Sequence, residues 1–389
     1  MIVLFVNKHA WKRPGPIVNV LVRNAHSFAE IGIETHLCLE NDGGPPDVAA
    51  DLRRHYGVEP SASLRVHRVD RWKLGGSRLS IPIFLHAARL ARELAKRDRV
   101  VVITRETSFL PYLARLVRDE RIRGFCELHD LYADLSWREG KVKLADRRLG
   151  WLERRYLPRL SGLICITEEQ QRLYRALFPA LPSIAAPLGT DPRPPGDVAR
   201  RFAARRAVFV GHLHGAKGVA MLVEATRELA RRGIRTAFWG GHERQIAELR
   251  ARTEALGSSA FVEFAGFRPP SELARALAEE ASVGVAPLQD TFYNRYLTCP
   301  VKVLDYLSHG LPVIGSDLPS VREVAAGAGR YVRAEHADAL IEHVAALLER
   351  RDAYEAAAAA ARARARELAW PVRASRIAEF ASGRSRPAT

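Results

Sequence analysis

The stretch IVLFVNKHAWKRPGPIVNVLVRNAHSFAEIGIETHLCL, residues 2–39, determines the expected fold. It opens with a short apolar run, residues 2–7, that is typical of a buried strand. Residues 17–32 have helical apolar spacing and end at a glycine, and residues 34–39 form a second strand-like run. A strand, a helix and a strand at this spacing predict a βαβ unit, whose crossover connection places both strands in a parallel sheet.

The same alternation continues along the chain. Further apolar runs typical of strands lie at residues 99–104, 125–130, 162–167, 207–213, 236–241, 261–267, 282–288 and 312–317. A proline-rich stretch, residues 186–196, interrupts the alternation and is the candidate hinge. The sequence therefore predicts an α/β fold with two Rossmann-like doubly wound domains, residues 1–186 and 187–368, that face a cleft. In such domains ligands bind beyond the carboxyl ends of the strands, so the loops that follow strands are the places to search.

The composition places the chain among globular proteins. Of its 389 residues, 47% are hydrophobic and 27% are charged, which excludes a disordered, collagen-like or small disulfide-stabilised protein. The formal net charge is +16. This excess fits attraction to anionic lipid, to a phosphorylated substrate or to nucleic acid, although general solubility explains it equally well. No nucleic-acid recognition motif accompanies the charge, so we expect no nucleic-acid partner.

Cysteine usage and the apolar runs indicate the compartment. The four cysteines are far apart in the sequence and form no CxxC pair, so buried thiols in a reducing cytosol are expected. No apolar run reaches the ~18 residues of a membrane-spanning helix, and the first residues lack the charged leader of a signal peptide. We therefore expect a cytoplasmic protein. No His, Cys and Asp cluster has metal-ligand spacing and no DxD motif is present, so no metal is expected.

Two segments that follow predicted strands carry residue types that bind phosphate. The first is VGHLHGAKG, residues 210–218. Its small residues let a phosphate approach the backbone, the next helix offers free N–H groups at its start, and Lys217 adds a positive charge. Neither the GxxxxGK[ST] loop nor a GxGxxG fingerprint is present, so a plain turn is the alternative.

The second segment is DTFYNRYLTCPVKVLDYLSHGLPVIG, residues 290–315. Pro300 is expected at the first position of a helix, with Lys302 and Asp305 in its first two turns. The first turn could bind a distal phosphate or a sugar, and the carboxylate of Asp305 could accept two ribose hydroxyls. The alternative is an aspartate that merely stabilises the start of its own helix.

Together these segments resemble the nucleotide-sugar-binding half of GT-B glycosyltransferases, specifically the retaining family 4, also called glycosyl transferases group 1. The hallmark S-P-x-K-x-x-E-Y-x-x-x-G-x-P-V-I reads here from Cys299 to Ile314, with Asp305 in place of the glutamate. The resemblance covers nearly the whole chain and is strong in the second half. Weaker matches are Val210-Gly211, Lys217-Gly218, Gly240-Gly241, Phe264-Ala265-Gly266 and Ala286-Pro287.

The resemblance implies the GT-B fold, in which residues 369–389, after the break at Trp370, form a helix that returns to the first domain and a frayed tail. It implies a retaining, metal-independent hexosyltransferase of polysaccharide biosynthesis, with no cofactor beyond its co-substrate. A sugar would pass from a nucleoside-diphosphate sugar to a hydroxyl of a glycan, lipid-linked or small-molecule acceptor. The alternatives are a non-catalytic GT-B-like subunit that binds a glycan or a partner, and a nucleotide-sugar epimerase-like enzyme.

The resemblance also assigns roles to single residues. His129 would face the donor sugar near the reacting carbon and is the candidate catalytic residue, Lys217 would hold the donor diphosphate, and Asp305 would bind the ribose. Arg105 and Asp130 are candidates for acceptor binding: Arg105 follows a predicted strand and could face an anionic acceptor, and Asp130 is a possible polar contact. The expected donor-binding set is Gly15, Gly211, His212, Lys217, Thr298, Cys299, Pro300, Val301, Lys302 and Asp305.

Three departures from the family pattern matter for donor binding. His212 replaces the phosphate-binding arginine, Leu297 replaces the first glutamate of the E-x7-E pair, and Asp305 is one methylene shorter than glutamate. A histidine can donate to phosphate but is only partly charged near neutral pH. Weak donor binding, or a degenerate relative, is therefore the alternative to a fully active enzyme.

A predicted helix of the first half, residues 146–160, mixes arginines with Trp151 and Tyr156. Membrane-active members of the family use such a face to reach lipid-linked acceptors. Peripheral contact with the anionic inner face of a membrane is therefore a candidate interaction. An ordinary packed helix with a solvated arginine face is the alternative.

Overall fold

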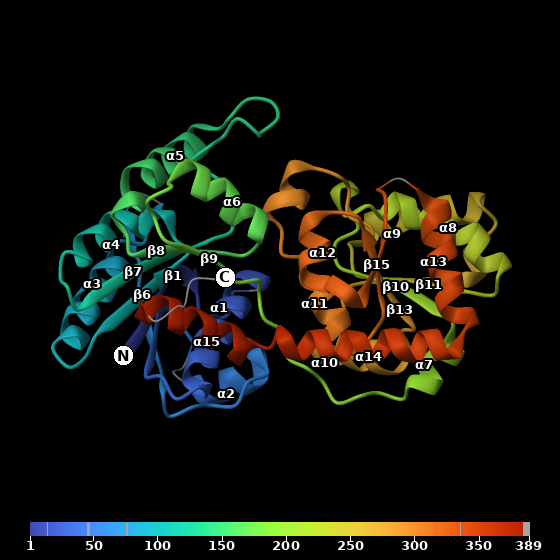
Figure 1. Ribbon diagram of the computed structural model, residues 1–389, viewed down its shortest axis with the longest axis horizontal. Coiled ribbons are helices and arrows are strands. Elements are labelled where there is room, and N and C mark those ends of the chain that lie inside the picture. Colours follow the sequence, from blue (N-terminus) through green and yellow to red (C-terminus); the bar gives the residue numbers. More distant parts are fainter. Residues whose placement is uncertain (14, 45–46, 75–76, 335, 384–389) are drawn as a thin grey trace. The chain divides into compact units, whose positions relative to one another are not determined.

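The computed structural model describes residues 1–13, 15–44, 47–74, 77–334 and 336–383. The chain divides into two compact units (Figure 1). Unit 1 comprises Met1–Gly189 and Trp370–Thr389, and unit 2 comprises Thr190–Ala369. The sequence had placed these boundaries after residues 186 and 368.

Unit 1 is built on a parallel sheet. Its strands are β1 (Ile2–Ala10), β2 (Thr35–Glu40), β3 (Leu64–Val69), β6 (Val100–Thr104), β7 (Ile122–Leu128), β8 (Gly162–Cys165) and β9 (Ser183–Ala185). They lie in the order β3-β2-β1-β6-β7-β8-β9, and every neighbouring pair is parallel. A separate antiparallel pair consists of β4 (Trp72–Leu74) and β5 (Ser77–Leu79). Residues 2–6 of the central strand β1 are all buried, as expected for a parallel strand covered on both faces.

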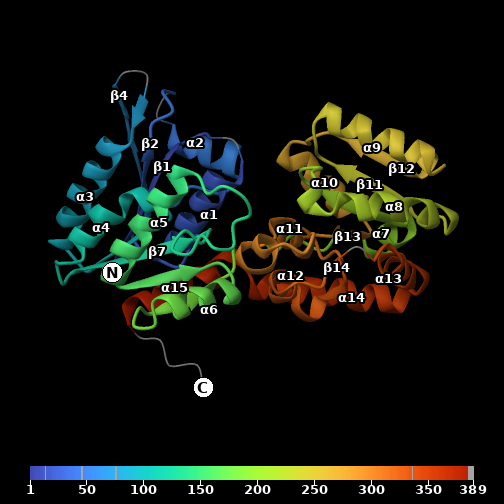
Figure 2. The ribbon, with the colours of Figure 1, turned by 90° about the horizontal axis from the view of Figure 1, so that it is seen from above.

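Helices cover both faces of this sheet. They are α1 (Pro16–Glu30), α2 (Val48–Asp51), α3 (Ile81–Ala95), α4 (Leu110–Leu116), α5 (Leu144–Tyr156), α6 (Glu168–Leu177) and α15 (Trp370–Ser382). Figures 1 and 2 show α1 and α15 side by side on one face, and α3 and α4 on the other. The face under α1 and α15 is a continuous apolar cluster that includes Phe5, Val22, Phe28 and Ile377.

Unit 2 repeats this architecture. Its strands are β10 (Arg206–Val210), β11 (Arg235–Trp239), β12 (Val262–Ala265), β13 (Val283–Ala286), β14 (Val313–Ser316) and β15 (Gly329–Val332), in the parallel order β12-β11-β10-β13-β14-β15. Its helices are α7 (Val198–Ala204), α8 (Val219–Arg231), α9 (Glu243–Ala255), α10 (Pro270–Glu279), α11 (Val301–Ser308), α12 (Pro319–Ala325), α13 (Ala337–Glu349) and α14 (Arg351–Glu367). The strand order reverses between β10 and β13, the point of a doubly wound sheet at which ligands bind. The predicted pair of doubly wound α/β domains is confirmed.

Helix α15 follows α14 directly in the sequence but belongs to unit 1. Its buried Arg373 donates to Oε2 of Glu127 at 2.9 Å, to Oδ1 of Asn24 at 2.8 Å and to the carbonyl of Pro187 at 2.9 Å. At its start the ring of Trp370 lies so close to Gly189 that a Cβ there would be 2.4 Å from it. A charged network and a tight glycine contact therefore fix the last helix to the first unit.

Most predicted elements differ from the observed ones by a few residues at their ends, and two of these differences concern candidate site residues. Strand β7 ends at Leu128, so His129 and Asp130 begin the following loop instead of ending the strand. Pro300 is the N-cap of α11, and the helix begins at Val301. The proline has no N–H to offer to the first turn, which makes it equally compatible with either position. No helix among the described residues is long and apolar enough to cross a membrane.

A pair of histidines on neighbouring strands makes unit 1 sensitive to pH. Nδ1 of His36 and Nε2 of His67 lie 2.9 Å apart, and Nε2 of His36 lies 3.0 Å from Oε1 of Glu34. Burial lowers the pKa of His36, and burial together with His36 and His86 lowers the pKa of His67 from 6.5 to about 4. The folded state thus keeps both rings neutral at pH values where the unfolded chain already binds protons.

We expect stability to fall as the pH decreases from 6.5 towards 4, because the unfolded histidines take up protons first. From pH 7 to pH 5, this pair should cost about 1–2 kcal/mol of unfolding free energy. Thermal unfolding across this range should therefore change less in His67→Gln than in the wild type. The exposed His55→Gln variant is the control, and an equal pH dependence in all three proteins would refute the effect.

Candidate functional site

The loop that follows β10 is shaped by glycines. Gly211 has a φ of 116° and donates its N–H to the carbonyl of Trp239 at 2.9 Å. Gly218, with a φ of 70°, precedes α8 and packs so closely on β13 that a Cβ there would lie 1.4 Å from the carbonyl oxygen of Pro287. A side chain is thus excluded at Gly218, and Lys217 is held next to the end of the central strands.

Helix α11 is pinned across the two central strands by Tyr306. Its hydroxyl accepts the N–H of Val210 at 3.0 Å and lies 3.2 Å from the carbonyl of Val285. The ring occupies the space above Gly284, where a Cβ would be 2.3 Å from it. This contact fixes the start of α11, and with it Lys302, beside the loop that carries Lys217.

Lys302 is the most unusual group of this region. Its Nζ is buried, finds no hydrogen-bond partner among the described residues, and lies 3.5 Å from the centroid of the Phe209 ring. Burial, with a contribution from Lys217, lowers the pKa of Lys302 well below its usual value, and burial also lowers the pKa of Lys217. The Oγ1 of Thr298, just before α11, is also buried without a partner in the part of the chain that the structure describes.

Buried polar groups without a partner among the described residues, such as Nζ of Lys302 and Oγ1 of Thr298, indicate a ligand site. An ammonium removed from water without a counter-ion is costly, and buried polar atoms are normally hydrogen-bonded. The pKa of His214 is lowered by burial and by Lys217, His212 and Lys302, which shows that it shares the same positive environment. The two lysines, Thr298 and the start of α11 therefore form a cradle for an anionic group such as a phosphate.

The ring of His212 lies near the aromatic rings of Phe267 and His242. Its ring centroid is 5.0 Å from that of Phe267 and 6.2 Å from that of His242, on loops that follow β12 and β11. It is 6.3 Å from the ring of His214. The exposed His212 thus belongs to a cluster of aromatic rings at the carboxyl edge of the sheet.

The remaining predicted donor residues occupy different environments. Cys299 is buried, Val301 is exposed, and the half-buried Asp305 lies in the second turn of α11, where its carbonyl accepts from Ser308 and His309. Gly15 is the N-cap of α1, with a φ of 98°, and belongs to unit 1, whereas the rest of the set belongs to unit 2.

In unit 1, His129 is part of the charged network around Arg373. Its Nε2 is 2.7 Å from Oε1 of Glu127. Burial opposes ionisation of Glu127, but Arg373 and His129 hold its pKa well below the usual range. The pKa of His129 is lowered by burial and by Arg105, although Glu127 raises it. The ionised carboxylate thus fixes the imidazole ring at the end of β7.

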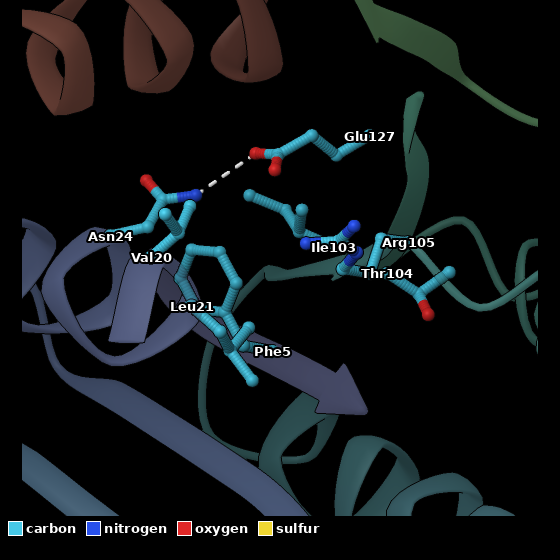
Figure 3. Close-up of a pocket in the computed structure, with 8 residues that line it drawn as sticks. All are labelled: Phe5, Val20, Leu21, Asn24, Ile103, Thr104, Arg105 and Glu127. Carbon is cyan, nitrogen blue, oxygen red and sulfur yellow. Dashed lines mark hydrogen bonds between the residues drawn. The ribbon is translucent and has the colours of Figure 1, made fainter. Parts of the chain in front are cut away.

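The two candidate acceptor residues are engaged differently. Asp130 accepts from Arg138 at 2.8 Å and from the N–H of Leu131 at 2.8 Å. Arg105 lines a narrow pocket of about 10 Å³ together with Asn24 and Glu127 (Figure 3). This volume has room for about one water molecule, so the pocket is not a substrate site.

Sequence reasoning missed three residues that build this region: Glu127, Arg373 and Glu153. The buried Glu153 accepts from the N–H groups of Tyr132 at 3.1 Å and Ala133 at 2.6 Å, and it therefore shapes the loop after His129. Burial is the main reason that its pKa is raised to about 7. For Glu127 the available signal was a glutamate inside an apolar strand, because a charged residue there is rarely buried without a specific partner.

Comparison with known proteins bears on this geometry. Residues 204–350 match the family model of glycosyl transferases group 1. Unit 2 carries a glycosyl transferases group 1 domain. The expectation of a glycosyltransferase is confirmed at this level, and the narrower assignment to the retaining family 4 stays a prediction. The sequence has no significant match among curated proteins.

Solved structures of other proteins share the fold over nearly the whole chain. Sucrose-phosphate synthase from Thermosynechococcus elongatus has a TM-score of 0.71 and 17% identity, covering 98% of both chains. Anabaena HepE with UDP and glucose has a TM-score of 0.69 and 17% identity, covering 98% of this chain and 99% of the other. WaaG, a glycosyltransferase involved in lipopolysaccharide biosynthesis, has a TM-score of 0.62 and 18% identity, covering 98% and 100%. These likenesses confirm the GT-B fold.

Removal of the Arg373 guanidinium tests the charged network of unit 1. Arg373→Met should destabilise the protein by about 3–5 kcal/mol, because the buried Glu127 loses the guanidinium that neutralises it. Thermal unfolding should show this loss, and Glu127→Gln in the same chain should restore part of it. Arg376→Met, on an exposed position of the same helix, is the control. Equal destabilisation by the two arginine variants would contradict the role given to the pair.

Proposed function

We propose that this protein is a retaining, metal-independent glycosyltransferase that uses a nucleoside-diphosphate sugar and needs no further cofactor. The observation that carries the proposal is the buried Nζ of Lys302 near Lys217, which has no hydrogen-bond partner in the described part of the chain and lies within the segment that matches the glycosyl transferases group 1 model. HepE, which shares the fold, has been solved with UDP-glucose. The proposed acceptor is a hydroxyl of a glycan, a lipid-linked saccharide or a small molecule.

In this proposal the donor diphosphate supplies the missing partner of Lys302. Its oxygens accept from Lys302 and Lys217, and free N–H groups at the start of α11 add further donors. Two ammonium groups offset much of the diphosphate charge, which is the task of the metal in metal-dependent transferases. Asp305 binds the ribose hydroxyls.

The chemical step needs no nucleophile from the protein. The acceptor oxygen attacks the anomeric carbon on the face from which the diphosphate leaves, the carbon–oxygen bond to the phosphate breaks, and a phosphate oxygen takes the acceptor proton. Lys217 and Lys302 stabilise the charge that develops on the leaving group. His129, fixed by Glu127, is the proposed catalytic residue of unit 1.

A non-catalytic binding protein is the second candidate, and two positions favour it. His212 lies with Phe267 and His242 instead of replacing the charge of an arginine, and Leu297 is fully buried. His212 does not supply the guanidinium, and Leu297 does not supply the carboxylate, that the family pattern has at these positions. Binding of a nucleotide distinguishes the two candidates.

Lys302→Met is the decisive variant for donor binding. Because it removes a buried cation without a partner, we expect the ligand-free protein to unfold at the same or a higher temperature. UDP, GDP, ADP, CDP and dTDP are added at millimolar concentration. One of them should raise the unfolding temperature of the wild type, as a ligand of the folded state does, and this rise should be lost in the variant.

Lys217→Ala should weaken the same nucleotide-induced rise, and the exposed Lys96→Met should leave it unchanged. If none of the nucleotides raises the unfolding temperature of the wild type, the protein is not a nucleotide-sugar enzyme. The non-catalytic alternative would then be the better description.

We further propose that the cytoplasmic protein contacts an anionic membrane through α5. Leu144 and Trp151 are 83% and 54% exposed, and their spacing places them on one helical stripe with Arg148 and Arg155. Both acidic residues of the helix are engaged: Asp146 pairs with Arg138 at 3.6 Å, and Glu153 is buried. The exposed face therefore combines cations with apolar side chains, the composition of interfacial helices.

Vesicle co-sedimentation tests this surface. The wild type should pellet with vesicles that contain phosphatidylglycerol and not with purely zwitterionic vesicles. Trp151→Ala with Arg148→Gln and Arg155→Gln should reduce the bound fraction by about tenfold or more, since each cation near the surface is worth about 1 kcal/mol. Arg244→Gln with Arg250→Gln in unit 2 is the charge control. Pelleting that does not depend on anionic lipid would rule the contact out.

A further inference from the structure

Unit 1 contains an open surface cavity of about 710 Å³ that none of the assigned residues lines. It lies at the carboxyl ends of β1, β2 and β3, which are neighbours in the sheet. Its charged lining consists of Lys8, Lys12, Arg13, Arg71, Glu40 and Asp42. The size falls within the range of small-molecule sites, and the place is where parallel sheets bind ligands.

The wall of this cavity is held by buried contacts. The fully buried Trp11 donates its Nε1–H to Asp51 at 2.7 Å, and its carbonyl accepts from the hydroxyl of Tyr56. The guanidinium of Arg71 donates to the carbonyl of Lys8, which ties the start of the β3–β4 connection to β1. The cavity is therefore already formed without a ligand.

Both carboxylates of the lining are already neutralised. Glu40 pairs with Arg71 at 3.0 Å, and Asp42 pairs with Lys12 at 3.2 Å and with Arg68 at 2.9 Å. Although burial opposes ionisation, Lys12 keeps the pKa of Asp42 below its usual value. Lys8 pairs with Glu106 at 2.8 Å, and Lys12 also lies 3.5 Å from Asp51. Three of the four cations that line the cavity thus have a carboxylate partner, and Arg13 is the exception among the described residues.

Two donors of the lining point to an anion that is still to be bound. The exposed Arg13 contacts the ring of His9, and within the described residues it has no carboxylate partner. Burial lowers the pKa of His9 to about 4, so this ring adds no charge near neutral pH. The Nε of Arg71 is buried and, in the part of the chain that the structure describes, has no hydrogen-bond acceptor.

We infer that this cavity binds a phosphate group carried by a polyhydroxylated molecule. Arginine and lysine donors match phosphate oxygens, and the cavity is much larger than a phosphate alone. Asn41, Glu40 and Asp42 offer oxygen acceptors to hydroxyl groups in the remaining space. Resting on the proposed function, the ligand is the acceptor, so the enzyme would transfer a sugar to a phosphorylated sugar or to a lipid with a phosphorylated polyol headgroup.

Calorimetric titration of the full chain tests this inference, with glucose 6-phosphate, glucose and inorganic phosphate as probes. Glucose 6-phosphate should bind at least about tenfold more tightly than glucose, since one charge-assisted contact is worth at least that factor. Lys8→Gln with Arg13→Gln should weaken glucose 6-phosphate binding at least about tenfold. Arg89→Gln with Lys96→Gln, on exposed positions of unit 1, removes the same charge and should have no effect.

A conservative variant tests the Nε of Arg71, the buried donor that has no acceptor among the described residues. Arg71→Lys keeps the positive charge beside Glu40 but removes the Nε donor. It should therefore weaken the binding of glucose 6-phosphate several-fold and leave the unfolding temperature near that of the wild type. Equal affinity for glucose and glucose 6-phosphate, binding of neither, or equal weakening in the control variant would overturn the inference.

Two further experiments test whether glucose 6-phosphate binds at the donor site instead, and whether the natural phosphate belongs to a lipid. Lys302→Met should leave glucose 6-phosphate binding unchanged, because that lysine belongs to the phosphate cradle of unit 2; if binding is lost, the ester occupies the donor site and the inference is wrong. Vesicles containing phosphatidylinositol, compared with phosphatidylglycerol vesicles, show whether the phosphate comes from a lipid. Competition of the inositol headgroup with glucose 6-phosphate identifies a lipid source, and absence of competition identifies a soluble one.

Failure of the inference is distinguishable from failure of the proposed function. If a nucleotide stabilises the protein through Lys302 but phosphate on glucose makes no difference, only the acceptor class is wrong. If glucose 6-phosphate binds through Lys8 and Arg13 but no nucleotide binds, the cavity stands and the transferase proposal fails.

Discussion

The hydroxyl of Tyr306 provides the contact on which the geometry of unit 2 depends. It reaches β10 and β13 together, at the point where the strand order reverses, and it can do so because Gly284 leaves room for the ring. A helix held at one point on each of two strands cannot slide along either of them. The position of Lys302 relative to the glycine-shaped loop of Lys217 therefore follows from a single ring and a single missing side chain. A bulkier residue at position 284 would displace the helix and both ends of the phosphate cradle with it.

Buried cations of this chain fall into two groups: those with polar partners in the fold, and Lys302, which has none among the described residues. Arg201 is fully buried, and its guanidinium donates to the carbonyls of His309 at 2.6 Å and Gly310 at 3.4 Å. Arg373 is paired with a carboxylate. Both arginines therefore serve the fold, whereas the Nζ of Lys302 has only an aromatic ring below it among the described residues. The difference matters for binding. The desolvation cost of Lys302 is not offset in the ligand-free protein, so an anion that pairs with Lys302 gains this free energy when it binds.

The sequence predicted those parts that depend on neighbouring residues. Central parallel strands are covered on both faces and so appear as apolar runs, which is why β1, β6 and β10 could be placed. The edge strand β3 was not predicted, because Arg65, His67 and Arg68 interrupt its apolar residues. The pair of Glu127 and Arg373 could not be predicted, since the two residues are 246 positions apart. Lys302 was identified as a binding residue, but lysine side chains usually extend to water, so its burial became evident only from Phe209 on another element.

The interrupted path of the chain has a consequence for synthesis on the ribosome. Unit 2 is encoded entirely between the two parts of unit 1, so its last residue is translated before the final helix of unit 1 exists. Until Arg373 emerges, the carboxylate of Glu127 sits in a nearly complete core without its counter-ion. The amino-terminal half of the protein thus reaches its native state last, although it is made first. A stop codon between residues 369 and 373 would spare unit 2 and leave unit 1 as a substrate for chaperones and proteases.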